Sequence, residues 1–154
     1  MVLIRKATLL DLDHIYDLIH QDHLKNILLP VPKDILIDWV RDFFVVFDDL
    51  HEIIVGCSAL HIYTSQLAEI RSLTVKKEFQ SKGIGQSLIQ ACIDEAKGLK
   101  IKSVFVLTKK NAFFNNLGFN ITKKNDLPEK VYKDCLHCTR KDQCDENAFV
   151  MNFF

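Results

Sequence analysis

The sequence EIRSLTV at residues 69–75 is followed by the polar turn KKEF at residues 76–79 and by the glycine-bearing segment QSKGIG at residues 80–85. Apolar and β-branched residues dominate the first segment, and this composition is typical of a buried strand. A second pattern begins at Gly85, where apolar residues recur with the spacing of a helix. The stretch therefore predicts a strand, a tight turn and a helix in direct succession.

The predicted helix runs from Gly85 to Lys97. Its apolar residues recur every four positions and would share one face; they are Ile84, Leu88, Cys92 and Ala96. Gly98 stands where a helix commonly ends on a glycine. The first N–H groups of a helix have no partners within it, and the helix dipole adds partial positive charge there. The turn before this helix therefore predicts an anion site suited to a pyrophosphate.

The glycine spacing separates this turn from two common phosphate-binding loops. The third glycine of the dinucleotide fingerprint is missing, and no Gly-Lys-Ser/Thr follows as in a Walker A loop. A Gly-x-Gly pair at the start of a helix is also explained by packing alone. The remainder of the chain is therefore needed to decide what this turn binds.

The bulk composition is that of an ordinary globular protein. A chain of 154 residues, 48% hydrophobic and 26% charged, is expected to form a single domain over residues 1–154. Twenty acidic residues balance twenty basic ones, which argues against a nucleic-acid partner. No signal peptide or membrane-spanning run is recognised, so we expect a cytoplasmic location and no membrane partner. Exposed strand ends and the pair Phe153-Phe154 leave a homodimer open.

Hydrophobic patterning in the rest of the chain predicts a mixed sheet flanked by helices. Further strands are predicted at residues 2–6, 43–47, 53–63, 101–108, 119–122 and 148–153, and further helices from residue 11, at residues 34–40 and at residues 111–117. Short links between the strands before residue 75 predict an antiparallel meander. The crossover through the helix predicts that strand 101–108 lies parallel to strand 69–75. Gly56, in the middle of a strand, predicts a bulge or a close backbone approach.

The five cysteines fall into two groups. Cys57 and Cys92 lie in apolar patterns and are predicted to be buried thiols. A second group lies in a polar segment with a spacing that suits zinc; it consists of Cys135, Cys138 and Cys144, with His137 as one candidate for a fourth ligand. One C-x-x-C pair is only half of a zinc site. The favoured interpretation is therefore a segment that lines or covers an amine site, with no metal.

Four stretches resemble the GCN5-related N-acetyltransferase (GNAT) family, and together they span nearly the whole chain. They are residues 4–11, residues 68–75, residues 80–89 with the pattern Gln-x-x-Gly-x-Gly, and residues 111–119, which end in Gly-Phe. The resemblance implies an α/β (α+β) fold: a mixed, mostly antiparallel sheet of about seven strands, flanked by helices, with a central β-α-β coenzyme-binding unit. It also implies acetyl-CoA as the cosubstrate and an amine as the acceptor.

A narrower resemblance concerns residues 69–73 and residues 127–134, which contain Leu-Pro-Glu-Lys followed by Lys-Asp. Both segments are similar to short amino-acid acetyltransferases that act as N-acetylglutamate synthases. This implies acetylation of the α-amino group of a free amino acid, with glutamate favoured, at the start of arginine synthesis. Two alternatives stay open: transfer to another amine, such as a polyamine or a protein N-terminus, and a non-catalytic acyl-CoA-binding regulatory module.

The resemblance further implies which residues hold the coenzyme. Backbone amides of the loop would hold the pyrophosphate, main-chain groups of the strand would pair with the pantetheine arm, and residues after the partner strand would flank that arm. The loop residues are Gln80, Ser81, Lys82, Gly83, Ile84 and Gly85. The strand residues are Leu73, Thr74 and Val75, and the residues that follow the partner strand are Thr108, Asn111 and Phe114. Thr108 and Asn111 have an alternative role as caps of the helix at 111–117. Phe114 stands where many members of the family carry a tyrosine that protonates the departing thiolate, so Tyr63, Tyr132 or water would replace it.

Direct acetyl transfer needs a group that accepts a proton from the attacking amine. Glu69 is the predicted base, and an ion pair with a neighbouring basic residue is its alternative role. Arg71, beside Ser72, is predicted to fork an acceptor carboxylate, with Lys130 or Lys133 closing over a second carboxylate. Glu69 and Arg71 would face one substrate by strand alternation unless a bulge interrupts the strand.

Overall fold

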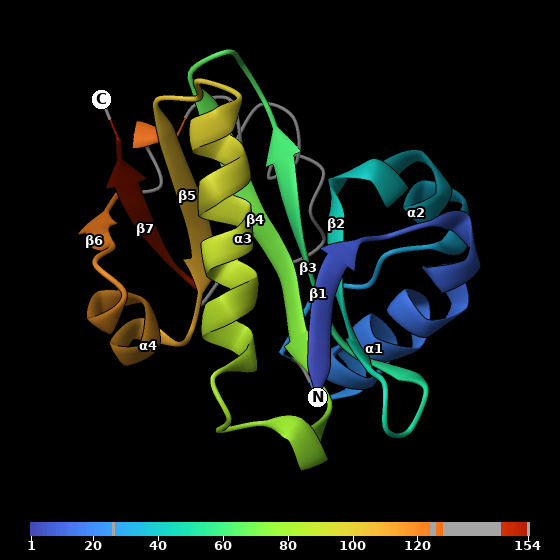
Figure 1. Cartoon of the computed structure of the whole chain (residues 1–154). Helices are drawn as coiled ribbons and strands as arrows, with labels where there is room; N and C mark the ends of the chain where they lie inside the picture. Colours follow the sequence, from blue (N-terminus) through green and yellow to red (C-terminus); the bar gives the residue numbers. More distant parts are fainter. Residues whose placement is uncertain (26, 124–125, 128–145, 154) are drawn as a thin grey trace. The chain divides into compact units, whose positions relative to one another are not determined.

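The computed structural model describes residues 1–25, 27–123, 126–127 and 146–153 (Figure 1). Its strands are β1 Val2–Lys6, β2 Phe43–Asp48, β3 Ile53–Ile62, β4 Leu67–Val75, β5 Ser103–Thr108, β6 Asn120–Thr122 and β7 Asn147–Asn152. Its helices are α1 Leu12–Leu24, α2 Lys33–Trp39, α3 Ile84–Gly98 and α4 Asn111–Asn116, with 3-10 turns η1 Leu9–Asp11, η2 Val40–Asp42 and η3 Lys77–Phe79. Each strand and helix predicted from the sequence has its counterpart, with bounds that agree within two residues.

The strands of the described residues form one seven-stranded mixed sheet in the order β1-β2-β3-β4-β5-β7-β6. β2 pairs antiparallel with β1 and with β3, and β7 pairs antiparallel with β5 and with β6. β4 and β5 run parallel, with Glu69 opposite Phe105. The predicted mixed, mostly antiparallel sheet, with its parallel pair joined through α3, is therefore confirmed.

The chain divides into two compact units. The first unit comprises Met1–His61 and Ile70–Glu95, and the second comprises Ile62–Glu69 and Ala96–Phe154. β4 and α3 contribute residues to both units. The single domain expected over residues 1–154 stays a prediction. Among the described residues, no helix has both the length and the apolar character needed to cross a membrane.

The first unit packs apolar side chains on both faces of β2 and β3. Val45 belongs to a cluster with Ile15 of α1 and Leu36 of α2, whereas Val46 belongs to a second cluster with Leu88 of α3. Both valines are fully buried, because successive strand residues point to opposite faces and each face is covered. Figure 1 shows α1 and α2 together beside these strands. Two-sided burial explains why β2 is a continuous apolar run rather than an alternating one.

The start of α1 is fixed by one buried carboxylate. The Asp11 carboxylate accepts hydrogen bonds from the backbone N–H of Thr8 at 2.8 Å and from the Arg5 guanidinium at 2.7 and 3.0 Å. Thr8 and Asp11 form the capping box of the 3-10 turn η1, which leads directly into α1. The forked guanidinium and the backbone donor favour the ionised form, so the pKa of Asp11 lies below its usual value of 3.8.

Replacing Asp11 by asparagine is expected to destabilise the protein by about 1–2 kcal/mol at pH 7, because a capping, charge-assisted partner is lost. The sign of the pH effect follows from the lowered pKa of Asp11. Its contribution is present above pH 3.8 and is lost as the pH falls through the lower pKa of the folded state. Urea titrations at pH 7 and pH 3 should therefore show a smaller difference between variant and wild type at pH 3. An equal difference at both pH values would contradict this account.

Helix α3 confirms the predicted apolar face but not the predicted C-terminal cap. Ile84, Leu88, Cys92 and Ala96 are all buried. Gly98 is the last helical residue, and it is Lys100 that takes the left-handed conformation with φ +65°. The Ile101 N–H donates to the Ala96 carbonyl at 3.0 Å and the Lys100 N–H donates to the Lys97 carbonyl at 3.1 Å, which together form a Schellman motif. The prediction of Gly98 as the cap is wrong, because Gly98 belongs to the helix and the left-handed residue that follows the helix is Lys100, two positions later.

The second unit has an aromatic core. Phe105 of β5 is fully buried and stacks at a tilt on Tyr63, with ring centroids 5.8 Å apart. Phe114 of α4 is 2% exposed and packs edge-on against Phe119 at 5.3 Å. Gly118 follows α4 with φ +94°, a conformation that glycine adopts without a Cβ penalty. The helix predicted at residues 111–117 therefore ends just before Gly118, within one residue of its predicted end.

Candidate active site

The turn between β4 and α3 is tied to the strands before it begins. The Lys76 N–H donates to the Val55 carbonyl at 2.8 Å, and the Gln80 side-chain amide donates to the Val75 carbonyl at 2.9 Å. The 3-10 turn at residues 77–79 lies between these two bonds. Gln80, the first residue of the Gln-x-x-Gly-x-Gly pattern, therefore anchors the turn to the end of β4 through its side chain.

Two left-handed residues shape the turn itself. Ser81 has φ +62° and Gly83 has φ +83°. The Gly83 carbonyl accepts hydrogen bonds from both the backbone N–H and the hydroxyl of Ser87, each at 3.0 Å. Ser87 thus donates the first bond of α3, so the N–H groups of residues 84–86 have no acceptor within the helix. These amides, at the positive end of a fifteen-residue helix, can bind an anion such as a pyrophosphate.

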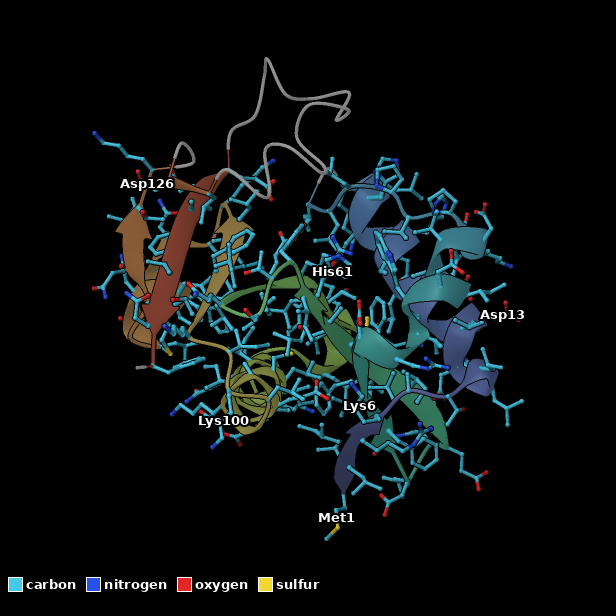
Figure 2. All side chains as sticks on the ribbon, turned by 90° about the horizontal axis from the view of Figure 1, so that it is seen from above. Met1, Lys6, Asp13, His61, Lys100 and Asp126 are labelled. Carbon is cyan, nitrogen blue, oxygen red and sulfur yellow. The ribbon has the colours of Figure 1, made fainter. Side chains whose placement is uncertain are left out.

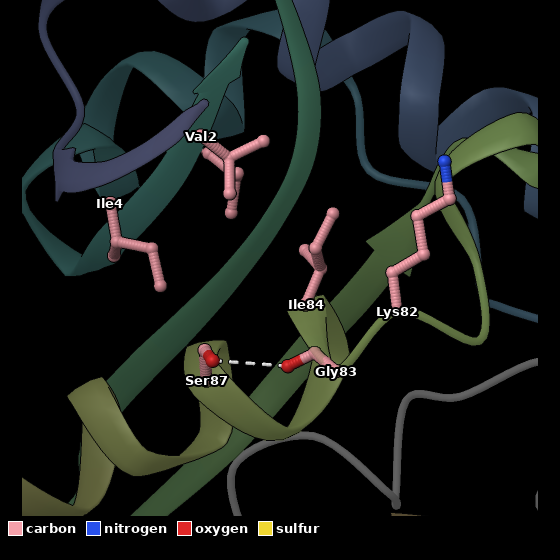
Figure 3. A pocket seen from close by; sticks show the side chains of 7 residues that line it. Val2, Ile4, Lys82, Gly83, Ile84 and Ser87 are labelled. Atoms are coloured by element: carbon pink, nitrogen blue, oxygen red, sulfur yellow. Dashed lines mark hydrogen bonds between the residues drawn. The ribbon is translucent and has the colours of Figure 1, made fainter.

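A hollow of about 190 Å³ lies beneath the start of α3. It is lined by Val2, Ile4, Val46, Lys82, Gly83, Ile84 and Ser87. Figure 3 shows the side chains of Val2 and Ile4 from β1 beside Ile84. Most of this lining is apolar, which does not suit a pyrophosphate, so we place the anion at the amides of the turn instead. Buried Ile84 holds the start of the helix against the sheet and keeps those amides on a rigid element.

Strand β4 is irregular just before the turn. Ser72 lies in the left-handed region with φ +58°, and its carbonyl accepts a weak hydrogen bond from the Cys57 thiol at 3.5 Å. Regular alternation of side chains therefore extends no further than Arg71. On the neighbouring strand, a Cβ at Gly56 would lie 3.2 Å from the Thr74 carbonyl oxygen. The close backbone approach predicted at Gly56 is confirmed, and Leu73, Thr74 and Val75 form the main-chain segment between Ser72 and the turn.

The two cysteines within the described residues are buried free thiols, as predicted. Burial raises the pKa of Cys57 far above its ordinary value and raises the pKa of Cys92 to about 12. A thiol with such a pKa is not a thiolate near neutral pH, and only the thiolate is an effective nucleophile. Neither cysteine is therefore equipped to carry an acyl group, which favours direct transfer between two bound substrates.

Glu69, the predicted base, is a buried carboxylate on β4. It is 3% exposed, and its Oε1 accepts a hydrogen bond from the Tyr63 hydroxyl at 3.1 Å. Tyr63 is held in turn by its ring contact with Phe105. A buried carboxylate held by a phenol has the fixed position that a general base needs. The structure therefore brings together two of the residues named from the sequence as proton-transfer candidates.

Arg71, the predicted carboxylate anchor, lies on an aromatic face. Its guanidinium carbon is 3.8 Å from the centroid of the Trp39 ring. Stacking of this kind holds a planar guanidinium in one orientation and leaves its charge intact. Arg71 belongs to the first unit and Glu69 to the second. Their shared action on one substrate stays a prediction.

Three predicted coenzyme residues lie in the second unit. The Thr108 hydroxyl accepts the Lys110 N–H at 2.9 Å, just ahead of α4. Asn111 is the first residue of α4 and accepts a hydrogen bond from the Asn147 side chain at 3.1 Å, so its alternative role as the helix cap is not seen. Phe114 is buried among aromatic rings, where it serves as a core residue. Coenzyme contacts by these three residues stay predictions.

Several predicted residues lie outside the described part of the chain. They are Lys130, Lys133, Tyr132 and the three cysteines Cys135, Cys138 and Cys144. Within the described residues, no group of three or more histidine, cysteine, aspartate or glutamate side chains could hold a metal ion.

Sequence reasoning missed the surroundings of Arg71. Trp39 falls in the helix predicted at residues 34–40 and His61 in the strand predicted at residues 53–63, and no pattern assigns either residue to the site. In the fold, the His61 imidazole contacts Trp39 and bonds to Asp42, so residues from α2, η2, β3 and β4 meet at one place. No local spacing signals this arrangement, because the four residues are brought together only by packing of helices on the sheet.

Comparison with known proteins identifies relatives that match most of the chain. Residues 12–119 match the model of the Acetyltransferase (GNAT) family. An uncharacterized N-acetyltransferase of Chlorobaculum tepidum is 36% identical over 147 residues, which cover 96% of this chain and 94% of that protein. An amino-acid acetyltransferase of Mycobacterium tuberculosis is 31% identical over 132 residues, which cover 85% of this chain and 75% of that protein.

A solved structure shows the same fold in a complex. N-acetylglutamate synthase from Neisseria gonorrhoeae, complexed with coenzyme A and N-acetyl-glutamate, superposes with a TM-score of 0.89 at 28% identity. The superposition covers 100% of this chain and 35% of the synthase chain, so this chain spans about a third of that protein.

Proposed function

Because the chain belongs to the GNAT acetyltransferase family, we propose that it transfers the acetyl group of acetyl-CoA to the α-amino group of a free amino acid, with glutamate as the favoured acceptor. The chain is an acetyl-CoA-dependent N-acetyltransferase. The choice of a free amino acid rests on the amino-acid acetyltransferase among its relatives, and the choice of glutamate on the synthase structure with N-acetyl-glutamate. On this proposal the product is N-acetylglutamate, at the start of arginine synthesis in the cytoplasm.

The observation that carries the proposal is the start of α3. The N–H groups of residues 84–86 precede the first bonded amide of the helix, and they follow a turn with little side-chain bulk. A Cβ built at Gly83 would have no atom within 4 Å, so the backbone is accessible there. These features fit the diphosphate of coenzyme A. When bound, acetyl-CoA supplies the thioester that the amine attacks.

The reaction is a direct acyl transfer. The amine nitrogen attacks the thioester carbonyl carbon, a C–N bond forms, and the C–S bond breaks to release coenzyme A as a thiolate. The amine loses a proton, and we assign that proton to the carboxylate of Glu69, directly or through one water. Tyr63 donates to Glu69 and would keep the carboxylate in place as it does so. Much of the rate would come from holding both substrates in one geometry.

Arg71 is the residue that we propose binds the acceptor amino acid. A guanidinium forks a carboxylate with two parallel hydrogen bonds, which a lysine cannot do. Its position on Trp39 gives this cation a fixed orientation. We assign one carboxylate of glutamate to Arg71, with Lys130 or Lys133 as the proposed partner of the other.

The acceptor is tested by a screen with purified protein and acetyl-CoA, in which release of the coenzyme thiol is followed for each amine. Glutamate is expected to give the highest kcat/KM among free amino acids. A polyamine and a peptide with a free N-terminus serve as the other arms of the screen. If no acidic amino acid is acetylated and a polyamine or a peptide is, the acceptor belongs to that second class and not to the acidic amino acids.

Replacing Arg71 by lysine is expected to raise KM for glutamate by about ten- to a hundredfold, because a charge-assisted forked contact contributes about 1.5–3 kcal/mol. The Kd for acetyl-CoA, measured by calorimetry, should change by less than twofold. Arg41→Lys is the matched control, because Arg41 is an exposed arginine on the neighbouring η2. A KM for glutamate that is unchanged in Arg71→Lys would remove Arg71 from the acceptor site.

A further inference from the structure

Four side chains of the first unit form a chain of contacts that ends on Arg71. Asp42 of η2 accepts a hydrogen bond from Nδ1 of His61 at 2.9 Å. The His61 ring is tilted on Trp39, with centroids 5.7 Å apart. On the other side of these contacts, the guanidinium carbon of Arg71 lies 3.8 Å from the centroid of the Trp39 ring. His61 lies near the end of β3 and is labelled in Figure 2.

Each contact in this chain fixes the orientation of the next group. The Asp42 carboxylate can only accept, so it favours the His61 tautomer in which Nδ1 carries the proton. The oriented imidazole packs on the indole of Trp39, which is half-buried at the end of α2. The indole in turn offers its face to the guanidinium, whose planar shape suits stacking. An arginine held in this way loses less freedom when it binds a ligand than an arginine in solvent.

We propose that Trp39, held by the His61–Asp42 pair, is the specificity determinant of the acceptor site: it positions Arg71 so that an acceptor with a side-chain carboxylate is favoured over its amide. This inference rests on the proposed function and deepens it. A carboxylate accepts both parallel bonds of the guanidinium fork, whereas the amide of glutamine offers one acceptor oxygen and turns donors toward the cation. Discrimination of this kind needs the guanidinium to be held in one orientation, and the indole face provides it.

The positioning role differs measurably from a structural one. Trp39 also packs against the apolar cluster of α1, α2 and β2, so its loss destabilises the fold to some degree. Lower stability alone would reduce the amount of active protein and would act equally on every acceptor. Loss of positioning would act on KM for the acidic acceptor and would leave kcat, and the kinetics of glutamine, nearly unchanged.

The kinetic test compares glutamate with glutamine. Trp39→Leu is expected to lower the glutamate-to-glutamine ratio of kcat/KM at least fivefold, through KM for glutamate. Asp42→Asn and His61→Gln should shift the same ratio in the same direction by a smaller factor, and Trp39→Phe should retain more of it than Trp39→Leu because an aromatic face remains. Phe44→Leu is the matched control, since it removes an aromatic ring from beneath Lys6, where the distance to the centroid is 4.5 Å. An equal loss for both acceptors in Trp39→Leu would overturn the inference.

A second test uses the fact that Trp39 is the only tryptophan of the chain. With coenzyme A bound, titration with glutamate is expected to change the tryptophan emission saturably, whereas glutamine at the same concentrations should change it little. Arg71→Leu should abolish the response to glutamate. If acetyl transfer to glutamate proceeds while its binding leaves the emission unchanged, the inference fails and the proposed function stands. If no acidic amino acid is acetylated, the proposed function fails.

Discussion

Replacing Glu69 by glutamine is expected to lower kcat by about 10²–10⁴-fold, the usual contribution of a general base. Glutamine keeps the shape of the side chain and still accepts a hydrogen bond from the Tyr63 hydroxyl, but it cannot take a proton from the amine. The variant should bind acetyl-CoA with an unchanged Kd, because the coenzyme is held by backbone amides of a different segment. Stopped-time thiol release for kcat and calorimetry for Kd separate the two effects.

Glu95→Gln is the matched control for this substitution. Glu95 is a half-buried carboxylate of α3 that pairs with Lys6 at 3.2 Å, so its replacement removes a charge of the same kind at another place. Its kcat is expected to stay within about twofold of wild type, as for most surface ion pairs. If Glu69→Gln retains wild-type kcat, the proton is taken by another group. If the wild-type protein binds the coenzyme but acetylates no amine, the chain is a non-catalytic binding module.

Replacing Gly83 by valine is expected to raise the Kd for acetyl-CoA at least about tenfold, which corresponds to 1.4 kcal/mol. Gly83 has φ +83°, where a side chain with a Cβ costs about 1–2 kcal/mol and a β-branched one costs more. The new side chain would also project into the open space beside the turn, where we place the diphosphate. The strain moves the backbone amides away from the geometry that an anion requires, and the side chain occupies the space of the diphosphate.

The same substitution at Gly98 gives a sharp comparison. Gly98 also has no atom within 4 Å of a built Cβ, but it lies at the far end of α3 and has an ordinary φ. Gly98→Val should leave the Kd for acetyl-CoA unchanged within about twofold, since surface substitutions remote from a site have little effect. Calorimetric titration of both variants with acetyl-CoA measures the difference. Equal affinities in Gly83→Val and in wild type would mean that the coenzyme does not approach this turn.

Local patterns explain why so much of the fold follows from the sequence. The apolar repeat from Ile84 to Ala96 has the period of a helix, and all four of its residues are buried in the structure. Short links between strands and one crossover leave few topologies, which is why the meander and the parallel pair of β4 and β5 were predicted correctly. Gly118 and Gly56 each mark a backbone feature that the structure contains.

The features that escaped prediction depend on neighbours in space. Gly98 suggested the end of α3, but the bonds from Lys100 and Ile101 close the helix at a non-glycine residue. Ser72 is left-handed within β4, and its residue type gives no signal of this conformation. The contacts of Arg71 with Trp39 likewise depend on how α2 docks on the sheet. Tertiary packing decides such details, so they are seen only once the chain is folded.

The central claim is that coenzyme A binds at the backbone amides before and within the first turn of α3, and glycine labelling tests it most directly. The chain contains five glycines, so protein labelled with ¹⁵N-glycine gives five amide signals. On titration with coenzyme A, we predict that the signals of Gly83 and Gly85 shift saturably while the signal of Gly98 stays in place. Stationary signals of Gly83 and Gly85 at concentrations of coenzyme A that saturate binding would contradict the account.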